Sequence, residues 1–256
     1  MAYGQERCVE KIVASSWDRV SCGMSIDAAQ SEAMWLALAE EFQEYLRKGL
    51  DSLGGKLANG VHEHFKFYAA VHINNAVAGY LVLKKGGMPK ASVLLIRPAL
   101  ESLLRLVAVH EKPELITRIA HEEYKEEKKL LSGFSKHRGD VAALEKNWKD
   151  FKSQYTARYS EHLFSEDKLT LRDVAESAGL ESVYLVQYRL YCKHTHGALR
   201  AMVGGLDNVG IQDSRSMAIC ALSAIEVIRT LGASAPDRVV LDHKFNTCDE
   251  RTKPQD

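Results

Sequence analysis

The sequence predicts an all-α protein, a single helical bundle around a central apolar helix at about residues 90–111. Apolar residues recur at three- and four-residue spacing over long stretches, which is the period of an amphipathic helix. The chain has only five prolines and is rich in Ala, Leu, Glu and Lys, which favour helices. It contains no convincing series of strands, no internal repeat and no glycine-rich phosphate loop.

The chain of 256 residues can form one large domain with a substantial core. We expect residues 27–235 to form this helical domain. Residues 1–26 lack sustained periodicity and are expected to be a poorly ordered lead-in. Residues 236–256 hold one short apolar run followed by a polar end, so they are expected to be a flexible tail.

The first helices are delimited by caps and glycines. Asp27 can cap a helix that continues to about Leu50 and ends in the turn Asp51-Ser-Leu-Gly-Gly55. A second helix begins near Val61, and the pair Gly86-Gly87 supplies its C-terminal stop. Apolar residues within the first helix recur at helical spacing, so one face of it is expected to meet the core.

The third helix, from Lys90 to about Glu111, is apolar on most of its circumference, which predicts a central position. Lys112-Pro113 breaks it, and Pro113 begins a fourth helix that reaches about Leu131. Residues 140–160 form a polar, Lys-rich helix with few apolar anchors, so we expect it at the periphery.

Three more helices complete the domain. Thr170 caps a short one that ends at Ser177. A long helix is expected from about Glu181 to Met202, ended by a glycine pair and a polar loop. The last expected helix covers residues 214–231, and its apolar positions are directed towards the core.

Composition limits the classes of function. Lys plus Arg equals Asp plus Glu at 34 each, so the formal net charge is zero and any basic site must be local. The five cysteines are scattered, odd in number and never in a CxxC pair, which indicates reduced thiols in a cytosol. The N-terminus has no signal-peptide pattern. We therefore expect a cytoplasmic location.

The densest apolar run, residues 91–109, contains Arg97, Glu101 and Arg105. Charges at these positions argue against a membrane helix, so we expect no membrane partner. Glu101 can pair with both arginines, because each lies four residues away on the same helix face. The favoured interpretation is an ion network that fixes the helix register. The alternative is that the network orients a functional face, or that Arg105 binds a phosphate.

The stretch covering residues 188–197 concentrates groups that transfer protons or bind phosphate. Each residue of a regular α-helix advances by about 100°, so Arg189 and His196, seven residues apart, share a face. His194 would point roughly 140° away from Arg189. On this geometry His196 is the better candidate partner of Arg189.

The face that carries Arg189 has the groups needed for metal-free RNA cleavage. An imidazole titrates near neutral pH and can move a proton, and a guanidinium can hold a phosphate at two points. These groups would activate a ribose 2′-hydroxyl and stabilise a phosphorane-like transition state. Lys193 and Arg200 lie close to the same stripe, and Tyr188 flanks it. The structural alternative is that the histidine on this face only satisfies a local hydrogen bond.

Other chemistries have weaker support. His62 and His64 lie two residues apart, which on a helix directs them to different sides. No HExxH motif or carboxylate-rich set accompanies them, so we expect no metal and no cofactor. Cys192 and His196 are spaced to form a nucleophile pair, but nothing in the sequence marks an oxyanion hole.

The segment covering residues 91–105 resembles the signature of a group of bacterial families of unknown function. Those families pair an Arg-(Pro)-x-x-Glu helix with a later Tyr-x3-Ser-x3-His helix. The second element here is Tyr188-x3-Cys192-x3-His196, with Cys where Ser is usual. These families in turn resemble the HEPN superfamily of helical domains, and the resemblance covers residues 63–231.

Many HEPN proteins are metal-independent ribonucleases that carry an Arg-x(4–6)-His motif and act as dimers in toxin–antitoxin and anti-phage systems. Arg189 fits this motif with His194 and also with His196. The resemblance implies a homodimeric endoribonuclease acting on single-stranded RNA, with an antitoxin or defence-complex partner. It equally allows a non-catalytic binding, dimerisation or regulatory module, and a small-molecule-binding bundle is a third possibility.

The resemblance also implies a role for each candidate residue. His196, or His194 in its place, would be the general acid or base, and Arg189 would stabilise the phosphate. Tyr188, Lys193, Arg200 and Arg105 would contact the substrate, and Arg97 and Glu101 would orient the site.

Overall fold

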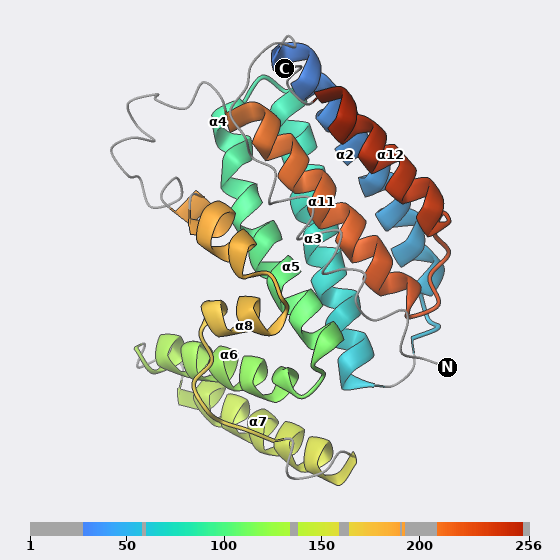
Figure 1. Ribbon diagram of the computed structural model, residues 1–256. Coiled ribbons are helices and arrows are strands. Elements are labelled where there is room, and N and C mark those ends of the chain that lie inside the picture. The colour runs from blue at the N-terminus through green and yellow to red at the C-terminus, as the bar shows by residue number, and fades with distance from the viewer. Residues whose placement is uncertain are drawn as a thin grey trace.

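The computed structural model describes residues 28–57, 60–133, 138–158, 164–189, 191–192 and 209–252. Every regular element in these ranges is helical and none is a strand, which confirms the expected all-α bundle (Figure 1). The lead-in expected at residues 1–26 lies outside the described residues. The elements are α2 (Ala28–Leu53), α3 (Val61–Lys85), α4 (Pro89–Ser92), η1 (Val93–Leu95), α5 (Ile96–Glu111), α6 (Leu115–Ser132), α7 (Arg138–Arg158), α8 (Leu171–Ser177), η4 (Val183–Tyr188), α11 (Val209–Arg229) and α12 (Arg238–Thr252).

The apolar core lies where α2, α3, α5 and α11 pack along one another (Figure 1). On α2 the buried side chains of Trp35, Phe42 and Leu46 follow the spacing of one helix face. Burial of each such side chain stabilises the fold by roughly 2 kcal/mol, so this face fixes how α2 lies on the bundle.

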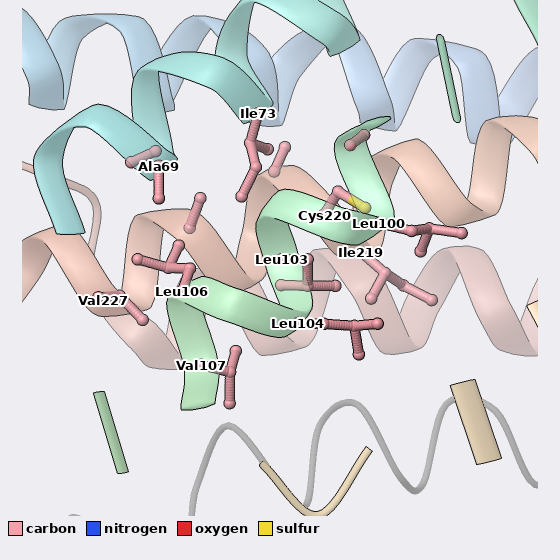
Figure 2. Packing of buried hydrophobic residues seen from close by; sticks show 14 of the residues in the cluster. Ala69, Ile73, Leu100, Leu103, Leu104, Leu106, Val107, Ile219, Cys220 and Val227 are labelled. Carbon is pink, nitrogen blue, oxygen red and sulfur yellow. The ribbon is translucent and has the colours of Figure 1, made fainter. Parts of the chain in front are cut away.

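The central apolar helix expected from the sequence is present as α5, which shares its central position with α11. Leu103 and Leu104 of α5 are fully buried. Figure 2 shows them in one cluster with Ile219 and Cys220 of α11. Residues 213–225 of α11 are all buried, because α2, α3 and α5 each pack against this helix. A helix that is covered on every side organises the elements around it.

The start of the central helix differs from the expected single run. Residues 89–95 form the short helix α4 and the 3-10 turn η1 before α5 begins at Ile96. Pro98 explains the change, because it has no N–H to donate to the Leu94 carbonyl and its ring crowds that oxygen. Despite its apolar face, α5 carries charges, and no helix in the described ranges is long and apolar enough to cross a membrane.

The peripheral position expected for residues 140–160 is found in α7, which pairs with α6 as a hairpin beside the main bundle (Figure 1). Stacked rings hold the two helices together. The ring centroids of Tyr124 and Trp148 lie 4.9 Å apart with planes at 10°, and His121 stacks on Trp148 at 5.4 Å. The hairpin therefore has its own small aromatic core.

The short helix α8 begins as its sequence predicts. The Thr170 hydroxyl accepts a hydrogen bond from the backbone N–H of Asp173 at 3.2 Å. The Asp173 carboxylate accepts one from the backbone N–H of Thr170 at 2.7 Å, which completes a capping box. The turn after α8 uses Gly179 with a φ of 68°, a left-handed conformation that glycine adopts without strain.

The expectation of a flexible tail at residues 236–256 is wrong for most of that segment. Residues 238–252 instead form α12, which lies on the outside of α2 (Figure 1). Leu241, Phe245 and Cys248 are buried at helical spacing. The rings of Phe245 and Trp35 meet edge to face at 5.3 Å, and the Trp35 Nε1–H donates to the Thr252 hydroxyl at 3.1 Å. The sequence did not predict this helix because its apolar residues are sparse and because Trp35, against which Phe245 packs, lies near the other end of the chain.

Candidate functional site

The helix expected from about Glu181 onward contains a π-helical segment, η4, from Val183 to Tyr188. In a π-helix each N–H bonds to the carbonyl five residues earlier, so the turn is wider than in an α-helix. Side chains before Arg189 therefore do not follow the 100° steps assumed from the sequence. Such turns occur often at functional sites.

A polar cluster joins η4 to the central helix α5. The Arg97 Nε–H donates to Glu101 Oε1 at 3.0 Å, which is the ion pair that their spacing predicts. The Tyr188 hydroxyl donates to the same Oε1 atom at 2.7 Å. The Arg97 guanidinium also lies over the Tyr188 ring, with its Cζ 5.7 Å from the ring centroid. We call Arg97, Glu101 and Tyr188 the Glu101 cluster.

The protonation states of this cluster follow from burial and from the Glu101 carboxylate. Burial, and then the hydrogen bond to Glu101, raises the pKa of Tyr188. Burial alone would lower the pKa of Arg97, but the hydrogen bond and the charge of Glu101 outweigh it, so this pKa is raised. Tyr188 is thus a neutral donor and Arg97 a permanent cation at neutral pH.

Cys192 lies against the Glu101 cluster. Its side chain is half-buried, and its proximity contributes to the raised pKa of Tyr188. The Tyr-x3-Cys spacing of the sequence therefore brings both side chains to α5. Cysteine at this position acts as a small polar neighbour of Tyr188.

Arg105 is not part of the Glu101 cluster. Its Nη1 atom lies 2.8 Å from Glu123 Oε1 of α6, so of the two arginines on α5 Glu101 pairs with Arg97 and not with Arg105. Both members of the Arg105 pair are exposed to solvent, and such a pair contributes about 0–1 kcal/mol. Arg105 fastens α5 to the α6–α7 hairpin.

Arg189 is the residue after Tyr188 in the sequence, and its side chain is exposed. Within the ranges that the structure describes, it makes no ion pair, and Glu101 is already engaged by Arg97 and Tyr188. The guanidinium charge of Arg189 is therefore directed to solvent beside a half-buried polar cluster. His194, His196, Lys193 and Arg200 lie outside the described residues.

A second polar group, which the sequence did not mark as functional, lies inside the bundle next to this site. The Tyr191 hydroxyl donates to Asp213 Oδ1 at 2.7 Å, and the Tyr80 and Ser214 hydroxyls lie 2.9 Å apart. Asp213 is only 1% exposed. Burial raises the pKa of its carboxyl to about 7. A run of polar residues at the start of an otherwise apolar helix is the one signal that pointed to it.

The remaining histidines do not assemble into a metal site in the described part of the chain, where no group of three or more His, Cys, Asp or Glu could hold an ion. His62 Nε2 lies 3.4 Å from the Tyr155 hydroxyl on α7. Burial lowers the pKa of His110 to about 4, so its ring is neutral at physiological pH. These histidines belong to the end of the bundle where α3 begins and α5 ends.

The fold and the site together define a class: an all-α bundle protein in which a polar cluster joins the central helix to a later π-helical turn. The chain belongs to the family of unknown function DUF5677, whose family model matches residues 64–212. The match includes the Glu101 cluster and Arg189, and it leaves α2, α12 and most of α11 outside. No curated protein and no solved structure matches the chain.

Proposed function

We propose that this protein is a metal-independent, HEPN-like endoribonuclease that cleaves single-stranded RNA, as a homodimeric toxin or anti-phage effector in the cytoplasm. One observation carries the proposal: Arg189 is exposed and makes no ion pair in the described ranges, and it directly follows Tyr188 of the Glu101 cluster in the sequence. The Glu101 carboxylate is not its counter-ion among the described residues. Glu101 is instead used by Arg97 and Tyr188.

The proposed reaction needs a base, an acid and a stabiliser of negative charge. The ribose 2′-oxygen attacks the adjacent phosphorus as His196, or His194 in its place, removes the 2′-hydroxyl proton. The 5′-oxygen leaves and takes up a proton from water, which produces a 2′,3′-cyclic phosphate and a 5′-hydroxyl end. Arg189 stabilises the charge that develops on the phosphoryl oxygens.

The other residues support this reaction in different ways. Lys193 and Arg200 are proposed to bind the RNA backbone, and a second protomer would double the local positive charge. Tyr188 is assigned a bracing role, because its hydroxyl is bound to Glu101 and the side chain is only 9% exposed. Arg105 could reach a phosphate only by leaving Glu123.

The experiment compares cleavage of a fluorescent single-stranded RNA by the wild type and single variants, with a metal chelator present throughout. Arg189→Ala should lower the rate by about 100-fold or more, the scale of losing one charge-stabilising donor. Arg251→Ala is the matched control, because Arg251 is also exposed and makes no ion pair in the described ranges, but lies on α12. His196→Ala and His194→Ala identify the functional histidine. Equal RNA integrity with the wild type, Arg189→Ala and both histidine variants would reject the nuclease.

The alternative function is a non-catalytic HEPN-like module that binds RNA or a partner in a defence or toxin–antitoxin system. The Glu101 cluster supports it, since this half-buried network fixes the packing of α5 and η4 without needing a reaction. The same RNA in a binding assay separates the two functions. A module would bind RNA through Arg189 and leave it uncut.

A further inference from the structure

The second polar group lies at the end of the bundle where α3 ends and α11 begins (Figure 1). Asp213 of α11 is buried there and makes no ion pair with any described residue. Lys84 of α3, whose charge acts on Asp213, is paired with Glu32 of α2 at 2.6 Å. A buried carboxylate without its own cation is costly when ionised, so this position favours the neutral acid.

Among the described residues, the side-chain hydrogen bond donated to Asp213 comes from a different part of the chain. Tyr191 follows Arg189 by two residues and is itself fully buried. Its bond to Asp213 therefore ties the turn that carries Tyr188 and Arg189 to the central helix α11. The bond alone favours the ionised carboxylate, but burial outweighs it. If the turn moves off α11 together with Tyr191, water hydrates the carboxylate and removes the cost of its charge.

We propose that Asp213 and Tyr191 form a proton-controlled latch, which holds the Arg189-bearing turn on α11 when Asp213 is neutral and favours its release when Asp213 ionises. The groups that face Asp213 from the packed elements set its response. Glu32 of α2 opposes ionisation, whereas Lys84 of α3 and the Tyr191 hydroxyl favour it. Tyr80 of α3 contacts the neighbouring Ser214 and stays protonated, because burial raises its pKa.

The latch has a defined pH window. The closed state holds its proton up to about pH 7, whereas the open state loses it near the ordinary Asp value of 3.8. Opening is therefore rarest in acid, rises by at most tenfold per pH unit between these values, and levels off above about pH 7. The pH dependence of opening is a property of the conformation, so the latch can be tested independently of the proposed RNA cleavage.

Amide hydrogen exchange, corrected for the intrinsic pH dependence, tests the latch at pH 5, 6, 7 and 8. Peptides that cover residues 183–192 should lose protection steeply between pH 5 and 7 in the wild type, while peptides from α5 should not. Asp213→Asn should make the protection of residues 183–192 independent of pH. Asp150→Asn is the control, because Asp150 is an exposed aspartate on α7 and should behave as the wild type.

Tyr191→Phe provides a second, independent readout. Its hydroxyl favours the ionised form of Asp213, so its removal should move the point where protection levels off to higher pH. This variant also keeps the test available if Asp213→Asn does not fold. Equal pH profiles for the wild type and Asp213→Asn, or an unchanged levelling point in Tyr191→Phe, would overturn the latch.

Discussion

Tyr188 and Arg97 donate to the same carboxylate oxygen of Glu101, at 2.7 Å and 3.0 Å. This shared acceptor joins the central helix to the π-helical turn that precedes Arg189.

Tyr188→Phe should lower the free energy of unfolding by about 1–2 kcal/mol, since it removes a partly buried hydrogen bond to a charged acceptor. Urea denaturation followed by circular dichroism measures the change. Tyr68→Phe is the matched control, because Tyr68 is 59% exposed. Equal destabilisation by both substitutions would show that the Glu101 bond contributes nothing specific.

A double-mutant cycle of Glu101→Gln and Arg97→Met should give a coupling energy of about 0.5–2 kcal/mol. The half-buried position strengthens this pair relative to a surface ion pair. The exposed pair Arg105–Glu123 provides the comparison and should couple by less than about 1 kcal/mol. The prediction fails if the two pairs couple equally.

The stability of the whole protein should contain a pH-dependent contribution from Asp213. Its pKa is raised from the ordinary 3.8 to about 7, so the folded state retains a proton that the unfolded state has lost. The stabilisation is complete below about pH 4 and is lost as the pH rises through about 7, by up to roughly 4 kcal/mol. Urea titrations of the wild type and Asp213→Asn at several pH values should show this slope only in the wild type. Parallel curves would mean that Asp213 titrates normally.

Phe245→Ala should destabilise the protein by about 3 kcal/mol, because it leaves a cavity beside Trp35. Thermal unfolding measures this loss, and Trp35 should become more accessible to a fluorescence quencher. Val239→Ala, on the same helix but 74% exposed, should change the melting temperature little. A similar, small effect of both substitutions would contradict the packed position of α12.

Helices whose ends carry local signals could be predicted from the sequence. The Thr170 cap placed α8 at Leu171–Ser177, and the glycine pair at 86–87 placed the end of α3. The π-helical segment could not be predicted, because Val183–Tyr188 contains nothing that distinguishes it from an α-helix. The packing of α12 depends on Trp35, more than two hundred residues earlier in the sequence.

The candidate site was predictable only where its partners share one helix. The Arg97–Glu101 pair follows from spacing on α5, but the Tyr188 bond to Glu101 spans 87 residues and depends on the tertiary fold. The carboxylate of Asp213 is buried by Tyr191 and the surrounding helices, so its altered acidity had no local signal. The assumption of regular α-helical geometry around Arg189 was wrong for the preceding turn, because Val183–Tyr188 is π-helical.

The boundaries of the family match bear on how the chain folds. The matched residues 64–212 include α5 but stop near the first turn of α11, and they omit α2 entirely. Those absent helices cover the apolar faces of α3 and α5. A fragment limited to the matched segment would therefore expose this surface to water and would not fold autonomously.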